Sequence, residues 1–351
     1  MALKPLVIYN AAPIEDMRAN TIQTTLNALE IAKLTHCHYH MLSVSGQGDQ
    51  VFKRISEADF DGELHFHRNK LSLLFGVLVD LLRSNGKLYC RSMTMALFAN
   101  YFLCRTAIVE LHQDRLTNRK QIDSVLRLVL RKIRPRKLKV VVISDALKRI
   151  FESQGLALNI VVIHDGFDAP QASQLTTRKP RITYTGMVSF ERGFGEICDL
   201  AKVFSECRFV VLGADPKLVR HFRQHANSIS SNIHVYSKQS RYRVHQFQVS
   251  STVLLALWGD DVPTMEYCSP LKIFEYMATG NRILMHDYKV LDEVVPETPL
   301  IKRFKSGDIK SAEIELGALL DLKETSINSA DLIEYCDRFS YKSRAEKLVT
   351  L

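Results

Sequence analysis

Short, nearly continuous apolar runs alternate with segments of helical periodicity along the whole chain. The runs are rich in Val, Ile and Leu, which is typical of strands buried on both faces of a parallel sheet. Between them, Ile22, Leu26 and Leu29 recur at helical spacing, and longer helical patterns cover 71–83 and 93–104. The alternation predicts a doubly wound α/β domain. Its expected strands cover residues 6–9, 39–44, 64–67, 87–92, 106–112, 139–144 and 160–166.

A second series of the same kind follows a polar segment that holds two prolines and shows no periodicity. Its expected strands cover 181–186, 208–214, 232–237, 251–258 and 281–286, with helices over 194–204 and 270–279. We therefore predict an α/β protein of two Rossmann-like domains in tandem. The expected parts are a first domain over 1–168, a linker over 169–180, a second domain over 181–328, and a C-terminal helix over 329–351 that could cross back to the first domain.

Length and composition agree with two domains. The chain has 351 residues, which exceeds the roughly 250–300 residues at which single cores stop growing. Its seven cysteines are scattered and form no CxxC pair, so a zinc knuckle or thioredoxin-type site is disfavoured, and a reducing compartment is favoured. The longest apolar stretches are about twelve residues, whereas a spanning helix needs about 20. We expect a cytoplasmic protein, soluble or peripheral at the inner membrane face.

Basic charge is concentrated in one segment, from Arg115 to Lys139. The chain carries a net charge of +9, which points to acidic partners. Within the segment, ten Lys and Arg against the single Asp123 also give +9, so the rest of the chain is about neutral. Apolar residues there recur at helical spacing, among them Val125 and Val129. One interpretation is a basic amphipathic helix that attaches to an anionic membrane surface, and the other is a solvated basic face over a stripe packed on the core.

The segment 268–280, CSPLKIFEYMATG, carries the strongest chemical signal. Ser269 and Pro270 suit a helix start, where exposed backbone N–H groups favour an anion. Lys272 in the first turn opposes the helix dipole, so a bound anion would compensate it. Glu275 lies one turn later on the same face. The plainer alternative is a capped amphipathic helix with surface charges.

SPLKIFEYMATG resembles the donor-site helix of glycosyltransferases with the GT-B fold, in particular the retaining, family 4-like enzymes. The resemblance spans nearly the whole chain. It implies two Rossmann-like domains facing a cleft and transfer of a sugar from a nucleotide-sugar donor to a glycan or lipid-linked acceptor. It also implies retention of configuration, no metal, no cofactor and no nucleic-acid partner. The other matching segments are 89–112, 141–151, 161–168, 181–194 and 209–216.

The resemblance also implies roles for residues of the second domain. Glu275 matches the second Glu of the Glu-x7-Glu motif, which accepts hydrogen bonds from the ribose. The amides of Leu271 and Lys272 match those that hold the distal phosphate, and Arg192 matches the basic residue that neutralises the leaving diphosphate. The implied donor-binding residues are Gly186, Arg192, Ser269, Pro270, Leu271, Lys272 and Glu275.

Two positions depart from the family pattern. The first Glu of the motif is replaced by Tyr267, with Glu266 one position away. Met187 stands where an Arg commonly follows the strand glycine. Arg192 and Lys272 are then the main expected phosphate cations.

In the first domain, His112 matches the family His that faces the reacting sugar, and with Arg192 and Lys272 it completes the expected catalytic set. Open α/β sheets place ligands at the carboxyl ends of their strands, which is where His112 is expected. The alternative is a buried His bonded to a backbone carbonyl. Arg91, Glu110 and Asn10 are candidate acceptor-binding residues, although Arg91 could simply pair with Glu110.

Other motifs are missing. No GxGxxG follows the first strand, which argues against an NAD site, and no P-loop sequence occurs. Asp260 and Asp261 are adjacent and form no DxD pair, so no metal site is expected. His36, His38 and His40 alternate in THCHYH and could form a metal face, but a polar connection between helix and strand is the favoured interpretation.

The sequence thus predicts a GT-B glycosyltransferase. Two alternatives remain open at this point. One is a GT-B epimerase, which binds a nucleotide sugar without transferring it to an acceptor. The other is a non-catalytic scaffold that keeps the fold, an alternative supported by Tyr267 and Met187.

Overall fold

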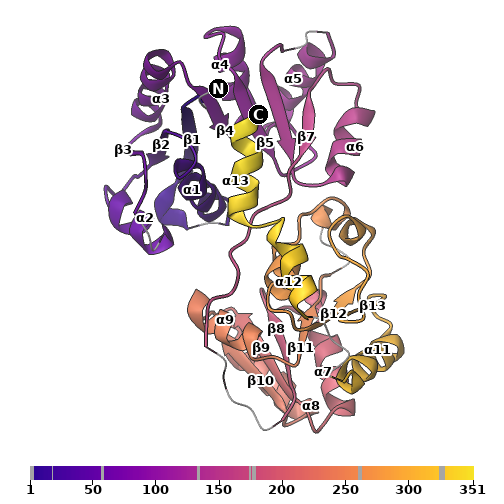
Figure 1. The fold of residues 1–351 in the computed structure, drawn as a ribbon. Coiled ribbons are helices and arrows are strands. Elements are labelled where there is room, and N and C mark those ends of the chain that lie inside the picture. Colours follow the sequence, from indigo (N-terminus) through magenta and orange to yellow (C-terminus); the bar gives the residue numbers. More distant parts are fainter. Residues whose placement is uncertain are drawn as a thin grey trace. The chain divides into compact units, whose positions relative to one another are not determined.

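The computed structural model describes residues 4–17, 19–56, 59–132, 135–173, 175, 179–259, 263–323 and 329–351. The chain forms two compact units, each built on its own parallel sheet (Figure 1). The first unit comprises Met1–Gly166, Tyr267–Ser269 and Phe339–Leu351. The second comprises Phe167–Glu266 and Pro270–Arg338.

The sheet of the first unit has seven parallel strands in the order β3-β2-β1-β4-β5-β6-β7. Its central strands are buried on both faces, because Val7 packs into one core cluster while its neighbours Leu6 and Ile8 pack into the other. The strands are β1 (Leu6–Pro13), β2 (Cys37–Leu42), β3 (Glu63–His67), β4 (Lys87–Cys90), β5 (Ala107–Leu111), β6 (Leu138–Val142) and β7 (Ile160–Val162). The helices are η1 (Ile14–Asp16), α1 (Ala19–Ala32), α2 (Gly48–Ser56), α3 (Lys70–Ser84), α4 (Met93–Tyr101), α5 (Lys120–Lys132), α6 (Asp145–Ser153) and α13 (Tyr341–Thr350).

The sheet of the second unit has six parallel strands in the order β10-β9-β8-β11-β12-β13. They are β8 (Arg181–Thr185), β9 (Arg208–Ala214), β10 (Ile233–Ser237), β11 (Val253–Ala256), β12 (Arg282–His286) and β13 (Ile301–Phe304). The helices are η2 (Phe190–Arg192), α7 (Phe194–Val203), α8 (Val219–Ile229), α9 (Arg241–Val249), η3 (Pro263–Glu266), α10 (Leu271–Met277), η4 (Lys289–Glu293), α11 (Ile309–Asp321) and α12 (Ser329–Asp337).

Two loops meet closely at the carboxyl edge of the second sheet. Gly213 at the end of β9 has φ +115°, and a Cβ placed on it would lie 2.1 Å from the carbonyl oxygen of Gly186, just after β8. Gly186 itself has φ +139°. Only glycine tolerates both the backbone angle and this approach. The edge of the sheet beside β8 is therefore shaped by backbone rather than by side chains.

The α/β class with two Rossmann-like units is confirmed, and each apolar run predicted as a strand forms one. The prediction of one helix over 329–351 is wrong. Two helices, α12 and α13, lie there, and α13 begins after Ser340, whose hydroxyl accepts a hydrogen bond from the Ser343 amide at 3.2 Å. A capping Ser starts a new helix because it satisfies N–H groups that have no partner inside the helix. The part of the chain that the structure describes contains no helix long and apolar enough to cross a membrane.

Candidate functional site

A pocket of about 760 Å³ opens at the carboxyl ends of β8, β9 and β10. It lies wholly within the second unit. Most of its lining is apolar, and its charged groups come from few positions, as in sites for small organic ligands. The lining residues are Thr185, Gly186, Met187, Val188, Ser189, Leu212, Gly213, Asp215, Leu218, Lys238, Gln239, Val244, Leu271, Lys272 and Glu275.

Lys272, in the first turn of α10, lines this pocket and lies close to two aromatic rings. Its Nζ lies 4.1 Å from the ring centroid of Tyr184 and 5.4 Å from that of Trp258. Its hydrogen-bond acceptor is the carbonyl of Leu257, at 3.4 Å. Burial, with repulsion from Arg192, lowers the pKa of Lys272 to about 7. Among the described residues no carboxylate lies within ion-pair distance of this ammonium, so an anionic ligand would stabilise its charged form.

Arg192 is a second cation without an acidic partner among the described residues. It ends the short helix η2 and is followed by Gly193, whose φ of +81° lets the chain turn directly into α7. The side chain is half-buried, and its charge acts on both Lys272 and Tyr184. Two neighbouring cations that lack a protein counter-ion favour a ligand with several negative charges.

Glu275 lines the same pocket one turn beyond Lys272. Its carboxylate accepts a hydrogen bond from Nε2 of Gln248 at 3.1 Å, and Gln248 is fully buried. Burial raises the pKa of Glu275, although the bond from Gln248 opposes that shift. The next residue, Tyr276, accepts a hydrogen bond from the Thr185 amide at 3.0 Å. This contact fixes α10 to the end of β8.

The predicted start of α10 needs a correction. The cap residue is Pro270, and the helix receives no side-chain cap. The Ser269 hydroxyl instead accepts a hydrogen bond from the Asp165 amide at 2.9 Å, within the first unit. The Ser269 oxygen is thus engaged by another backbone amide and leaves the amides of Leu271 and Lys272 uncapped.

The two residues at the altered motif position have different surroundings. Tyr267 is buried in the core of the first unit, where its carbonyl accepts a hydrogen bond from the Ser144 hydroxyl at 2.8 Å. Glu266 ends η3 and is exposed. Met187 is 66% exposed and lines the pocket of the second unit. Of Tyr267 and Glu266, the two candidates for the first Glu of the motif, only Glu266 has a carboxylate.

A second pocket, of about 380 Å³, lies in the first unit at the carboxyl ends of β4 and β5. Arg91, Glu110 and His112 line it together. The ring of His112 contacts Arg91 and Glu110, and its Nδ1 lies 3.7 Å from an oxygen of Asp165. The His112 side chain is 24% exposed, so one edge of the ring faces solvent.

Glu110 is the centre of this cluster and is fully buried. The Arg91 guanidinium donates to it at 2.9 and 3.2 Å, and Tyr89 and Arg344 donate to it as well. Burial alone would raise the pKa of Glu110, but Arg344, Arg91 and His112 hold it well below its usual value. A carboxylate with this many donors has no lone pair left for an acceptor molecule. Glu110 therefore influences a ligand only by holding Arg91 and His112 in position.

Asn10 does not join this group. It is buried, its Nδ2 donates to the Tyr39 hydroxyl at 3.2 Å, and its Oδ1 accepts from the Ala12 amide at 3.1 Å. These contacts lie near the carboxyl end of β1, where the register with β2 shifts between Asn10 and Pro13.

Sequence reasoning missed Arg344, which supports the pocket of the first unit, and three residues that line the pocket of the second unit. Arg344 has no local signal, because it reaches Glu110 from 234 positions away. Lys238, Gln239 and Val244 follow β10, and the rule that ligands lie at the carboxyl ends of strands would have suggested them.

The basic segment forms α5, and its burial differs from the expected pattern. Val125, a member of the expected core stripe, is 60% exposed and faces solvent, and the neighbouring Leu128 is 58% exposed. Arg127 pairs with Asp123 at 2.5 Å and is largely buried, because it also donates to the Asp114 carbonyl at 2.8 Å. The exposed basic residues of the helix, Lys120, Arg131 and Lys132, are near its ends, and Arg131 donates to the Gln154 carbonyl at 3.3 Å.

No protein-family model and no curated protein sequence matches the chain. Solved structures match over almost its whole length. Anabaena HepE in complex with UDP has a TM-score of 0.68 at 14% identity, covering 99% of both chains. HepE in complex with UDP-glucose has a TM-score of 0.64 at 12% identity, covering 99% of this chain and 100% of that one. A glycosyltransferase from Rickettsia africae has a TM-score of 0.70 at 12% identity, covering 99% and 97%. The likeness shows that the chain has the GT-B fold.

Proposed function

We propose that this chain is a glycosyltransferase that uses a nucleotide-sugar donor bound in the pocket of the second unit. The observation that carries the proposal is the pair of cations Lys272 and Arg192, which have no protein counter-ion among the described residues. A nucleoside diphosphate supplies the missing negative charge and a planar base for the apolar lining. The UDP and UDP-glucose complexes of HepE, which has the same fold, support this choice of donor class.

The proposed chemistry needs positive charge where the leaving diphosphate forms. Lys272 and Arg192 stabilise that charge as it develops in the transition state, so transfer needs no metal ion. Glu275, whose carboxylate lines the pocket, accepts hydrogen bonds from the ribose hydroxyls. His112, held by Glu110, positions the sugar in a reaction that retains configuration. Arg91 binds the acceptor, a glycan or a lipid-linked sugar.

Nucleotide binding gives the direct test. UDP, in magnesium-free buffer with EDTA, is expected to raise the melting temperature of the full chain, because a ligand at 100 times its Kd stabilises by about 2.7 kcal/mol. UMP should raise it much less, since it lacks the distal phosphate that Lys272 and Arg192 would contact. The measurement is a fluorescence melting curve with matched concentrations of UDP, UMP and other nucleoside diphosphates. If no nucleoside diphosphate raises the melting temperature of the chain, the proposed donor site is refuted.

Product analysis separates the proposal from its alternatives. A transferase yields a conjugate between the sugar and an acceptor, which mass spectrometry detects. An epimerase yields an altered nucleotide sugar, or free sugar and nucleotide, without any conjugate. A scaffold leaves the donor unchanged.

We also propose that α5 attaches the first unit to an anionic membrane surface. Lys120, Arg131 and Lys132 are exposed beside the apolar Val125 and Leu128. Exposed apolar side chains flanked by basic ones are characteristic of helices that lie in a membrane interface. Each basic residue near an anionic leaflet contributes about 1 kcal/mol. A lipid-linked acceptor would then be reached at the membrane surface.

We expect the chain to co-sediment with anionic vesicles at low salt, and only weakly with neutral vesicles or at high salt. Replacing Lys120, Arg131 and Lys132 with Gln should reduce sedimentation at least tenfold without changing the UDP melting shift. Arg127 stays unchanged because it holds Asp123, and Arg134 lies outside the described residues. The matched control replaces three exposed lysines of the second unit, Lys217, Lys305 and Lys310, with Gln. Equal losses in both triple variants would contradict a role specific to α5.

A further inference from the structure

Five histidines gather at one edge of the first unit, on the strands β2 and β3 and just before β2. The parallel register places His38 beside Glu63 and His40 beside His65. Alternate residues of a strand face the same side of a sheet, so His38 and His40 share a face with Glu63, His65 and His67. The helix α3 packs on β2 and β3. A face that is normally apolar under a helix is here lined by imidazole rings and a carboxylate.

Asp80 of α3 brings a second carboxylate to this face. Its Oδ2 lies 3.5 Å from Nδ1 of His38 and 3.5 Å from Nε2 of His65. These three ligand atoms all lie within 4.8 Å of one another. Zinc with His and carboxylate ligands at 2.0–2.1 Å in tetrahedral geometry holds its ligand atoms about 3.4 Å apart. Two of the three pairs of ligand atoms, those of Asp80 with His38 and with His65, are therefore close to the spacing of a tetrahedral ion, and the third pair lies within 4.8 Å.

The histidine nitrogens that face the carboxylates have no hydrogen bond. Nδ1 of His38, Nε2 of His65 and Nε2 of His40 are buried without a hydrogen-bond partner. The carboxylate oxygens lie close to them but not along a hydrogen-bond direction. Buried polar atoms are nearly always satisfied, and three orphaned nitrogens turned toward one carboxylate need an explanation. A cation bound by His38, His65 and Asp80 satisfies the two ligand nitrogens and the carboxylate together, and leaves His40 Nε2 beside Asp80 at 3.0 Å.

A supporting group orients these side chains. His40 lies with Nε2 3.0 Å from Oδ2 of Asp80 and Nδ1 3.0 Å from Nε2 of His67. Its ring also stacks on that of His65, with centroids 4.4 Å apart and planes 14° apart. Gly76 of α3 makes room, because a Cβ there would lie 2.6 Å from the His67 ring. Groups of this kind around metal ligands fix ring orientation and strengthen binding.

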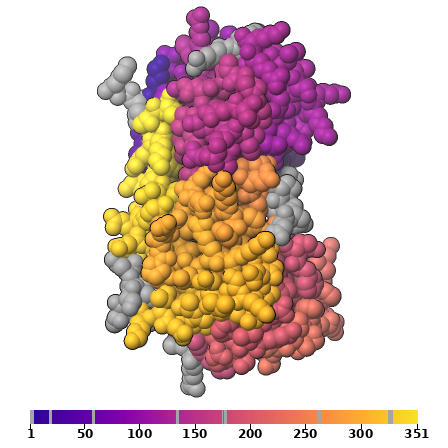
Figure 2. Space-filling view, turned by 90° about the vertical axis from the view of Figure 1, so that its right-hand side faces the viewer, coloured from indigo at the N-terminus to yellow at the C-terminus, as the bar shows by residue number. Residues whose placement is uncertain are grey.

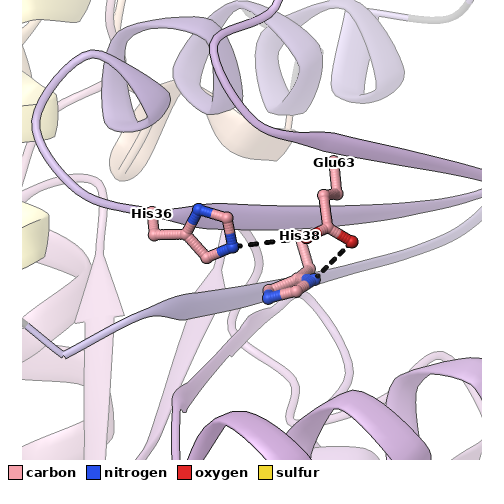
Figure 3. A group of neighbouring side chains, drawn as sticks. All are labelled: His36, His38 and Glu63. Atoms are coloured by element: carbon pink, nitrogen blue, oxygen red, sulfur yellow. Dashed lines mark ion pairs between the residues drawn. The ribbon is translucent and has the colours of Figure 1, made fainter.

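We propose that His38, His65 and Asp80 bind one zinc-class divalent cation, with the Glu63 carboxylate at the fourth position. Glu63 lies within reach, since its Oε2 is 3.4 Å from Nδ1 of His38 and 3.5 Å from Nε2 of His65. Figure 3 shows this carboxylate between His36 and His38. It is 52% exposed, so the ion enters from the solvent beside the edge strand β3.

The ligands come from β2, β3 and α3, so the ion fastens the edge strand to its neighbour and to the covering helix. Another cluster with metal-compatible spacing, Glu110, His112 and Asp165, is a poorer candidate. Its central carboxylate already holds Arg91 and Arg344 and has no orphaned oxygen. In the part of the chain that the structure describes, no Arg or Lys pairs with Glu63 or Asp80 in the cluster on β2 and β3.

The test uses the full chain after treatment with a chelator. Titration with cobalt(II) is expected to give the absorption bands of a tetrahedral ion, and competition with a chromophoric chelator should show one zinc ion bound per chain. Asp80→Asn and His65→Gln should each weaken zinc binding at least a hundredfold. His36→Gln is the matched control and should weaken it less than threefold, because His36 packs edge-on against the His38 ring and pairs with Oε1 of Glu63, not with Oε2, the oxygen that lies near His38 and His65.

Far-ultraviolet circular dichroism confirms that each variant is folded, and the cobalt spectrum of the unaltered chain needs no variant at all. The proposal is overturned if the unaltered chain does not bind zinc stoichiometrically. It is also overturned if Asp80→Asn keeps full zinc affinity. Loss in His36→Gln as large as in His65→Gln also overturns it, because the ion would then sit among His36, His38 and Glu63. The UDP melting shift is read separately and should persist in every variant.

Discussion

Lys272→Met is expected to weaken binding of a nucleoside diphosphate ten- to a hundredfold, while the ligand-free protein melts no earlier than the unaltered chain. A charge-assisted hydrogen bond to phosphate is worth about 1.5–3 kcal/mol, and the variant loses it. In the ligand-free protein this ammonium is buried beside Arg192, and no carboxylate of the described residues lies within ion-pair distance of it. Methionine fills a similar volume against Tyr184 and carries no charge to desolvate. The substitution therefore stabilises the ligand-free fold while it weakens diphosphate binding.

The pH dependence of Lys272 supplies an independent readout. Its pKa is about 7 in the folded protein against 10.5 for an ordinary lysine. Between these two values the unfolded chain binds a proton that the ligand-free folded chain does not, so this group makes the protein more stable as pH rises through that window. Below about pH 7 both states are protonated and the contribution is constant.

Diphosphate binding needs the charged form and shows the opposite trend. Its affinity should fall as pH rises above about 7, and binding at pH 8 should take up a proton. Isothermal titration calorimetry in two buffers of different ionisation enthalpy measures that proton directly, and Lys272→Met should abolish it. Lys289→Met, an exposed position outside the pocket, is the matched control. Unchanged UDP affinity in Lys272→Met would remove the lysine from the donor site.

Arg344→Leu is expected to destabilise the first unit by about 3–5 kcal/mol, the cost of leaving one member of a buried ion pair without its partner. Arg344 is 1% exposed and donates to the Glu110 carboxylate and to the carbonyls of Ile163 and His164. Its removal leaves Glu110 buried with one cationic partner fewer. Urea unfolding curves for this variant should show the loss.

The single tryptophan, Trp258, lies in the second unit and makes the measurement specific. Tryptophan fluorescence should report an unchanged transition, whereas circular dichroism should report an earlier one. Lys342→Met, on the exposed side of the same helix, should stay within about 0.5 kcal/mol. Adding Glu110→Gln to Arg344→Leu should recover part of the loss, because the unpaired charge is gone. A change below about 1 kcal/mol in Arg344→Leu would mean that Arg91 alone satisfies the carboxylate.

Strands were the most predictable part of the fold, since each apolar run forms a strand of one of the two parallel sheets. β13 was not predicted because its sequence, Ile301–Phe304, is apolar only at its ends and lies at an edge. The predicted cap of α10 was wrong because the Ser269 hydroxyl has another partner, the Asp165 amide, which lies 104 positions away in the sequence. Local preference cannot anticipate a competing partner that only the folded chain supplies.

The candidate sites also differ in whether local spacing or the folded chain brings their residues together. Lys272 and Glu275 lie on one short helix, so their shared face follows from spacing alone. The histidine cluster depends on the register between β2 and β3, which brings His40 beside His65. The alternation in THCHYH indicates the histidines that β2 contributes to this face. Those that β3 contributes, in ELHFH, can be assigned to the same face only when the pairing of the two strands is known. The sequence alone favours a polar connection between helix and strand at THCHYH, whereas the structure places His38 and His40 within β2.

The order in which a ribosome makes this chain is at odds with the order in which its first unit is completed. That unit takes its last segment from Phe339–Leu351, after the whole of the second unit has been synthesised. A nascent chain that has reached Arg338 therefore holds Glu110 without Arg344, and α1 without the helix that packs on it. The second unit has all of its residues at that stage. Although domains usually fold from the N-terminus onward during synthesis, here the C-terminal unit can finish first, and the N-terminal unit reaches its native core only when the final helix leaves the ribosome.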